Sequence, residues 1–125
     1  MSTVTIRFAV SNIENGVQKP GAIPSSAFDI ATTSTVTYQA TQVVGTTEAV
    51  VVAGAATDNC LCAITNQHAT ATVSVGVVVS AVFYPLLTIP AGETAYMPRL
   101  SSIAGTFVKS SVATTGILVT LIKIV

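Results

Sequence analysis

Short runs rich in Val, Thr and Ile recur along this chain, separated by turn signals about every ten residues, a spacing typical of antiparallel sandwiches and barrels. The clearest run is 2–10, in which apolar and polar residues alternate with the period of a half-buried strand. β-Branched residues favour strands because they pack well on a pleated surface, and no window shows a sustained helical period. We therefore expect an all-β fold: an antiparallel two-sheet β-sandwich, jelly-roll-like, with eight or nine strands.

The stretch 82–100 is the part around which we expect the other strands to pack. Two apolar runs flank Pro90-Ala91-Gly92-Glu93, where proline presets one backbone angle and glycine tolerates a positive φ. This pattern predicts either a β-hairpin or a sheet corner. We expect strands within 2–10, 31–44, 48–53, 60–66, 70–79, 82–89, 94–100, 106–111 and 117–125.

A polar segment, 11–26, follows the first run and holds the turn signals Asn15-Gly16 and Pro20-Gly21. A loop of this length in a compact domain is often functional, or is an arm that lies on a neighbour, although a solvated excursion fits equally well. The length of the chain predicts one domain. We expect a single β-sandwich domain over 1–125 with a long N-terminal loop at 11–26.

The composition is unusual for the surface of a free monomer and has two explanations, a surface of polar uncharged residues or burial against partners. Half of the residues are apolar and only 8% are charged, against about 25% charged residues in a typical soluble domain. The charges cancel, so the chain lacks the basic face of a nucleic-acid-binding protein. Ser and Thr explain part of such a surface, and burial against other subunits would explain the rest. We expect a homo-oligomer with protein partners and no nucleic acid.

No apolar stretch reaches the roughly 20 residues that a membrane-spanning helix needs. The segment 1–10 has no basic region followed by an apolar core, so we expect no signal peptide and no membrane partner. Synthesis in a cytosol-like compartment would keep Cys60 and Cys62 reduced.

The run 117–125 is apolar on both faces, which indicates a strand that is buried on both sides. In a thin sandwich, we expect another subunit to cover one of those sides. A monomer would otherwise expose a long apolar edge, which proteins usually avoid.

Catalytic motifs are lacking. His68 is the only histidine, and although Glu48 and Asp58 could orient it, no nucleophile motif accompanies it. We expect His68 to be a solvated turn residue and the protein not to be an enzyme. Cys60 and Cys62 would lie on one strand face, but a structural zinc needs about four ligands and only His68 could add one. We expect both cysteines to be small buried hydrophobes, with no metal, no disulfide and no cofactor.

The remaining candidates are scattered. The carboxylates show no paired spacing, and no glycine-rich phosphate loop is present. Three tyrosines could form a platform that stacks against a sugar, although tyrosines at strand ends more often pack with a hydrated hydroxyl. The carboxylates are Glu14, Asp29, Glu48, Asp58 and Glu93, and the tyrosines are Tyr38, Tyr84 and Tyr96.

The second half, 60–125, contains an ordered series of short motifs: a strand ending in Asn, a valine-rich strand with Gly, an aromatic-Tyr-Pro step, a Pro-Ala-Gly-Glu turn and an Arg-Leu pair. In this order they resemble a family of small bacteriophage virion proteins. The matching pieces are Ile64-Thr65-Asn66, Val73-Ser74-Val75-Gly76-Val77, Phe83-Tyr84-Pro85-Leu86, Ile89-Pro90-Ala91-Gly92-Glu93 and Pro98-Arg99-Leu100.

The resemblance implies a β-sandwich that assembles in a virion and is made in the host cytoplasm. The function we expect is that of a capsid decoration or cement protein, a homotrimer that binds the major capsid protein or other virion proteins. The segment 11–26 is the candidate arm for contact with the capsid or for exchange between subunits. A neck or tail component is the alternative within this class, and a carbohydrate-binding host-attachment module is the alternative outside it.

Overall fold

The computed structural model describes residues 2–8, 13–14, 16–18, 26–32, 37–52 and 58–123. These residues form strands and turns, and the described part contains no helix, so it offers none that could cross a membrane. The N-terminal strands are β1 Ser2–Phe8, β2 Ile13–Glu14, β3 Val17–Gln18 and β4 Ser26–Thr32. The later strands are β5 Thr37–Val44, β6 Ala49–Val50, β7 Asp58–Asn66, β8 Val73–Val79, β9 Val82–Ile89, β10 Thr94–Ser102, β11 Phe107–Ser110 and β12 Thr115–Lys123.

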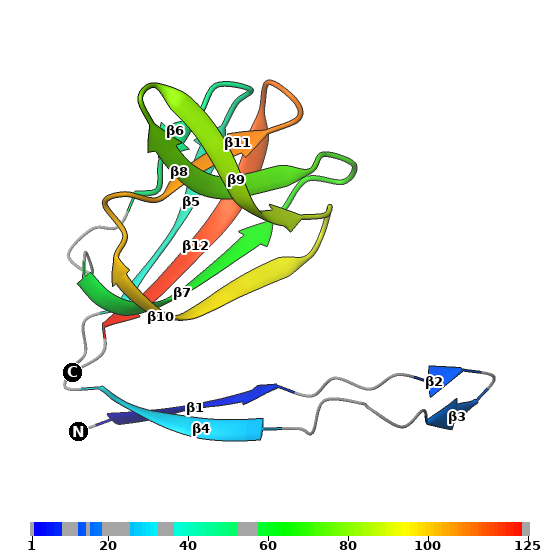
Figure 1. Ribbon diagram of the computed structural model, residues 1–125, viewed down its shortest axis with the longest axis vertical. Coiled ribbons are helices and arrows are strands. Elements are labelled where there is room, and N and C mark those ends of the chain that lie inside the picture. Colours follow the sequence, from blue (N-terminus) through cyan, green and yellow to red (C-terminus); the bar gives the residue numbers. More distant parts are fainter. Residues whose placement is uncertain are drawn as a thin grey trace.

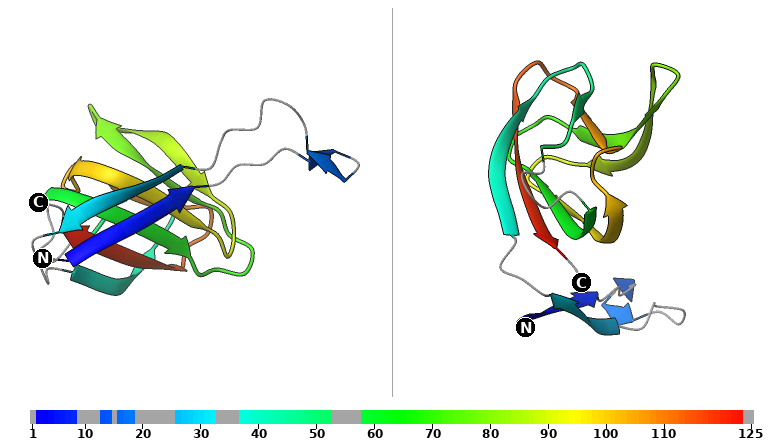
Figure 2. Two further views of the ribbon diagram at one scale, coloured as in Figure 1. Left: turned by 90° about the horizontal axis from the view of Figure 1, so that it is seen from below. Right: turned by 90° about the vertical axis from the view of Figure 1, so that its left-hand side faces the viewer.

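The strands from β5 to β12 form two four-stranded antiparallel sheets, with the orders β10-β7-β12-β5 and β6-β11-β8-β9. Along the chain these strands alternate between the sheets, except that β8 and β9 lie side by side in one sheet. The pairs β8–β9, β7–β10, β6–β11 and β5–β12 are successive segments of one folded antiparallel ribbon. This is the topology of the double-sheet jelly roll, and Figure 2 shows its two layers. The predicted fold class is confirmed, with eight strands in the sandwich.

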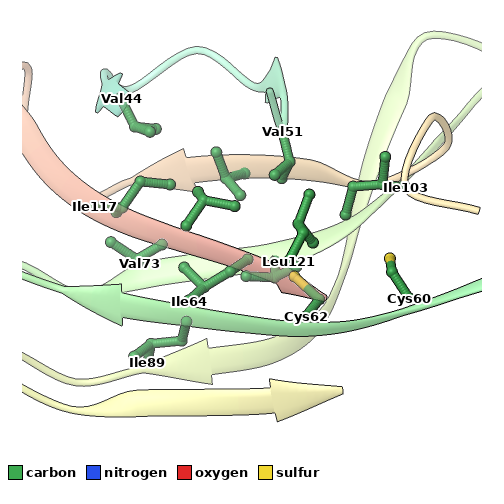
Figure 3. Packing of buried hydrophobic residues seen from close by; sticks show 13 residues of the cluster. Val44, Val51, Cys60, Cys62, Ile64, Val73, Ile89, Ile103, Ile117 and Leu121 are labelled. Carbon is green, nitrogen blue, oxygen red and sulfur yellow. The ribbon is translucent and has the colours of Figure 1, made fainter. Parts of the chain in front are cut away.

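The core lies between the two sheets and is built from apolar side chains of both (Figure 3). Ile64 of β7 and Leu121 of β12 come from one sheet, and Val73 of β8 and Val108 of β11 come from the other; all four are fully buried. The burial of one such side chain stabilises the fold by roughly 1.5–3 kcal/mol. The described members of this cluster lie between Val44 and Leu121.

A turn at each end of β9 determines where the strand begins and ends. Ser80 and Ala81, which join β8 to β9, have φ angles of 50° and 65°, as a two-residue type I′ hairpin turn requires. After β9, the Glu93 N–H donates a hydrogen bond of 3.1 Å to the Pro90 carbonyl, and Gly92 has a φ of 77°. This second turn carries the chain from β9 into β10 of the other sheet. Of the two structures considered for 82–100, the sheet corner is therefore the observed one.

The N-terminal strands form small sheets of their own. β1 pairs with β4, and β2 pairs with β3 around Gly16, which has a φ of 76°. The segment 11–26 thus contains a short hairpin and the first residue of β4, where we expected only a loop. The predicted strand 31–44 is also divided: its described residues belong to the end of β4 and to all of β5.

The last strand lies inside its sheet and is less buried on one face than on the other. β12 pairs with β7 on one side and β5 on the other, so it lies inside its sheet and presents no free edge. Ile117, Val119 and Leu121 are buried in the core, while Leu118 and Ile122 on the other face are half-buried. The described part of 117–125 is therefore fully buried on its core face and half-buried on the other, where we expected another subunit to cover it. The exposed apolar edge of the sandwich belongs to β9.

Candidate binding surface

The outermost strand β9 carries the main group of exposed apolar side chains. Among the described strands it pairs with β8 alone, at the end of the order β6-β11-β8-β9 (Figure 1). The exposed fractions in β9 are 50% for Val82, 51% for Tyr84 and 70% for Leu86, and Leu87 is also exposed. Val79, which ends β8 and pairs with Val82, is 55% exposed. We call these five residues the β9 patch. Contiguous exposed apolar surface on a folded protein marks an interaction site more often than single exposed residues do.

A β-bulge shapes the middle of β9. Val75 pairs with Leu87 and Gly76 with Pro85, so Leu86 is the extra residue of the bulge. Gly76 permits the close approach of the two strands, because a Cβ there would lie 2.0 Å from the carbonyl oxygen of Tyr84. Proline and bulges in an edge strand both hinder the addition of a further strand. The β9 patch is therefore suited to side-chain packing rather than to extension of the sheet.

Beside the patch, a groove of about 630 Å³ opens between β8, β9 and β10. Val75 and Val77 form one wall, Leu86 and Leu87 another, and Met97 belongs to the opposite sheet. None of the described lining residues is charged. The other lining residues are Gly76, Leu100, Ser101, Ser102, Gly105 and Thr106. A groove of this kind accepts apolar side chains of a partner, because it offers contact area but no charge to orient a polar ligand.

A second hollow, of about 410 Å³, lies on the outer side of the same sheet. Ser74 of β8, Phe83 of β9 and Lys109 of β11 are among the residues that line it, so this hollow is more polar than the groove. It is wide and shallow, and its described side chains do not enclose a ligand.

The structure does not bring the three tyrosines together as a platform. Tyr38 packs against the core from β5, at the opposite end of its sheet from β10, which carries Tyr96. Tyr84 belongs to the other sheet. Three strand spacings of about 4.8 Å separate β5 from β10, more than a sugar ring spans.

Cys60 and Cys62 are buried thiols on the core side of β7, as expected for small hydrophobes. Burial first, and the neighbouring Cys60 second, raise the pKa of the Cys62 thiol to about 12. A thiol with a raised pKa carries little thiolate near neutral pH, so Cys62 is a poor nucleophile. The described residues contain no group of His, Cys, Asp or Glu side chains that could hold a metal ion.

His68 lies in the turn after β7, but it is half-buried and hydrogen-bonded rather than solvated. Its Nδ1 accepts hydrogen bonds from the N–H groups of Thr70, at 3.0 Å, and Ala71, at 2.9 Å. Its own N–H donates to Oδ1 of Asn66, which is fully buried. His68 thus shapes the β7–β8 turn.

Asn66 connects this turn to the buried end of β9 through hydrogen bonds. Its Nδ2 donates to the carbonyl oxygens of Ala71, at 2.7 Å, and Ile89, at 3.0 Å. Its backbone also bonds to Gly92 and Glu93 of the sheet corner. Glu93 and Glu48 lie on separate elements, while the side chains of Glu14, Asp29 and Asp58 lie outside the described parts.

Sequence reasoning identified the apolar stretch that contains β9 but expected other strands to cover it. The position of Pro85 inside the run could have indicated an edge strand, because proline cannot donate to a central ladder. Comparison with protein-family models, with curated proteins and with solved structures finds no match for this chain.

Proposed function

We propose that this chain is a non-catalytic structural subunit of a phage virion, and specifically a decoration protein that stabilises the capsid. The observation that carries the proposal is the β9 patch beside an uncharged groove, on an edge of the sandwich that no described strand covers. Such a surface is suited to binding another protein.

The proposed mechanism is adhesive. Copies of the chain, most simply a trimer, bind at the contacts between major capsid subunits and bridge them. Each 100 Å² of apolar surface removed from water contributes about 2.5 kcal/mol before the costs of association. This added contact resists the outward pressure of the packaged genome.

Three residues of the motifs that carry the resemblance have structural roles here. Asn66 joins a turn to β9, Gly76 admits the close approach of Tyr84, and Gly92 supplies the positive φ of the sheet corner. These roles concern the jelly roll itself. The location on the capsid is therefore the part of the proposal that most needs an experiment.

The test is to locate the chain in particles from the virus that carries its gene. We expect many copies on the head, and we expect heads without the protein to release their DNA at a lower temperature. Full-length chain added back should restore stability, whereas the Leu86→Asp variant should not. Val43→Asp is the matched control, because Val43 is equally exposed, at 67%, on the distant strand β5. Absence from purified particles contradicts the proposal, and labelling of the neck or tail contradicts its capsid part.

A further inference from the structure

The turn between β7 and β8 depends on the protonation state of one side chain. The ring nitrogen Nδ1 of His68 accepts hydrogen bonds from the N–H groups of Thr70, at 3.0 Å, and Ala71, at 2.9 Å. A neutral imidazole has one nitrogen that carries a hydrogen and one that accepts, so this geometry places the ring hydrogen on Nε2. The closed turn therefore requires the neutral form of His68.

A protonated imidazole cannot make these two bonds. It donates a hydrogen from both ring nitrogens and accepts none. A hydrogen on Nδ1 would point at two backbone N–H groups that are donors themselves, so both bonds would be lost. Ala71 is buried, with an exposed fraction of 2%, and its N–H would then lack an acceptor where water has little access. Protonation of Nδ1 and the closed turn are therefore incompatible.

Asn66 extends this dependence to the sheet corner and to β9. The His68 N–H donates to Oδ1 of Asn66 at 3.0 Å. The Asn66 Nδ2 donates to the carbonyl oxygens of Ala71, at 2.7 Å, and Ile89, at 3.0 Å. The backbone carbonyl of Asn66 accepts from the Gly92 N–H at 3.0 Å. A turn that opens at Ala71 removes one partner of the Asn66 side chain, and it thereby weakens the contact that holds Ile89 at the buried end of β9.

The segments around this turn offer little charge to offset a positive ring. They are the sheet corner, at 90–93, and the start of β12, whose Gly116 carbonyl accepts from the Gln67 N–H at 3.0 Å. On the described residues of these segments Glu93 is the one charged side chain, and it is exposed. Lys109 of β11 pairs in register with Ser74, farther along β8. An exposed carboxylate stabilises a neighbouring cation only weakly, so the loss of the two hydrogen bonds at Nδ1 decides the response to acid.

We propose that His68 is a pH-sensitive switch: acidification opens the β7–β8 turn and thereby loosens the buried end of β9. Histidine is the side chain that ordinarily changes its charge between about pH 5 and 8. The open turn can take up a proton at Nδ1 that the closed turn excludes, so the open population rises as the pH falls. The switch goes beyond the proposed function and does not depend on it. Its consequence for binding is that acid makes β9, which carries most of the β9 patch, more mobile.

The test is amide hydrogen exchange of the full chain from about pH 8 to pH 5, with each rate divided by the intrinsic rate at that pH. Exchange of the Thr70 and Ala71 amides should accelerate by up to about tenfold per pH unit, because opening takes up one proton. The Asn66 and Gly92 amides should follow with a smaller change. His68→Asn is the decisive variant, because Oδ1 of asparagine is bonded to Cγ as Nδ1 is and accepts N–H groups without titrating. This variant should match wild type at pH 8 and show no acceleration at pH 5.

Nitrogen NMR of the wild-type ring decides the question even if asparagine does not reproduce the turn. It should place the ring hydrogen on Nε2 at neutral pH, and protonation of Nδ1 should coincide with the faster exchange. His68→Ala removes the acceptor and should show fast exchange at Thr70 and Ala71 at every pH. Gln67→Ala, at the exposed neighbouring position, is the matched control and should keep the wild-type pH profile. A ring hydrogen on Nδ1 at neutral pH, an acid response that persists in His68→Asn, or protection of Thr70 and Ala71 that does not change with pH would each overturn the inference.

Discussion

β12 and β9 are both rich in apolar residues but have very different environments. Both are apolar at most positions, yet β12 alternates between fully buried and half-buried residues while β9 is exposed along nearly its whole length. β12 lies between β7 and β5 and faces the other sheet, whereas β9 has β8 on one side and no described strand on the other. Only Ile89, at the end of β9, is fully buried. The number of neighbours, and not the apolar content, decides which strand builds the core and which remains available for a partner.

The largest expected effect tests this contrast directly. Leu121→Ala in β12 should lower the free energy of unfolding by about 2–5 kcal/mol, because it leaves a cavity in the core. Leu86→Ala removes the same atoms from β9 and should change it by no more than about 0.5 kcal/mol in the monomer. Chemical denaturation of the two variants measures the difference. Equal losses would show that a partner or another part of the chain covers Leu86.

The buried end of β9 should be nearly as sensitive as β12. Asn66→Ala removes the donor to Ile89 and the acceptor for His68, so buried backbone groups lose their partners. We expect a loss of about 2–3 kcal/mol in the free energy of unfolding, measured by denaturation. Gln67→Ala, at the exposed neighbouring position, is the control and should be close to wild type. A neutral Asn66→Ala would mean that water replaces these hydrogen bonds readily.

The middle of β9 depends on the space left by Gly76. Gly76→Ala should cost about 2 kcal/mol, because its Cβ overlaps the Tyr84 carbonyl and must push β9 away from β8. Gly105→Ala is the control, since no atom lies within 4 Å of its Cβ. Amide hydrogen exchange should show faster exchange in β9 for the first variant alone. Unchanged protection of β9 would contradict the close approach of the two strands.

The free energy of unfolding should depend on pH through Cys62, a core residue of β7 that pairs in register with Leu121 of β12. Burial raises the pKa of Cys62 from its ordinary 9.0 to about 12. Above pH 9 the unfolded chain releases this proton while the folded chain keeps it, so the free energy of unfolding falls as pH rises. The expected slope from this group is about 1.4 kcal/mol per pH unit. Denaturation at pH 8 to 11 should show a shallower slope for Cys62→Ala than for wild type, and equal slopes would contradict the assignment.

The contrast between β12 and β9 also shows which parts of the fold can be predicted from the sequence. Alternation of apolar residues located most strands, and Pro90 with Gly92 indicated the sheet corner, because both signals are local. The sheet order is not local: β12 pairs with β5, whose residues lie some 80 positions away, and only this pairing places it in the interior. The groove likewise combines β8, β9 and β10 from two sheets. Its existence depends on the Val75–Leu87 register and the bulge, which no short sequence motif encodes.

The turn that begins β9 carries the smallest expected effect and the one with the opposite sign. Ser80 and Ala81 both adopt a positive φ, which costs residues with a Cβ roughly 1 kcal/mol each. Asn-Gly is the preferred sequence for this turn type, because glycine adopts a positive φ freely and asparagine tolerates it. The double variant Ser80→Asn/Ala81→Gly should therefore raise the free energy of unfolding by about 1 kcal/mol, measured by denaturation. Since the side chains of β9 are unchanged, its solution mass should match that of wild type. A loss of stability would show that the Ser80 or Ala81 side chain makes a contact worth more than the strain, and a change in mass would show that the turn belongs to the interface.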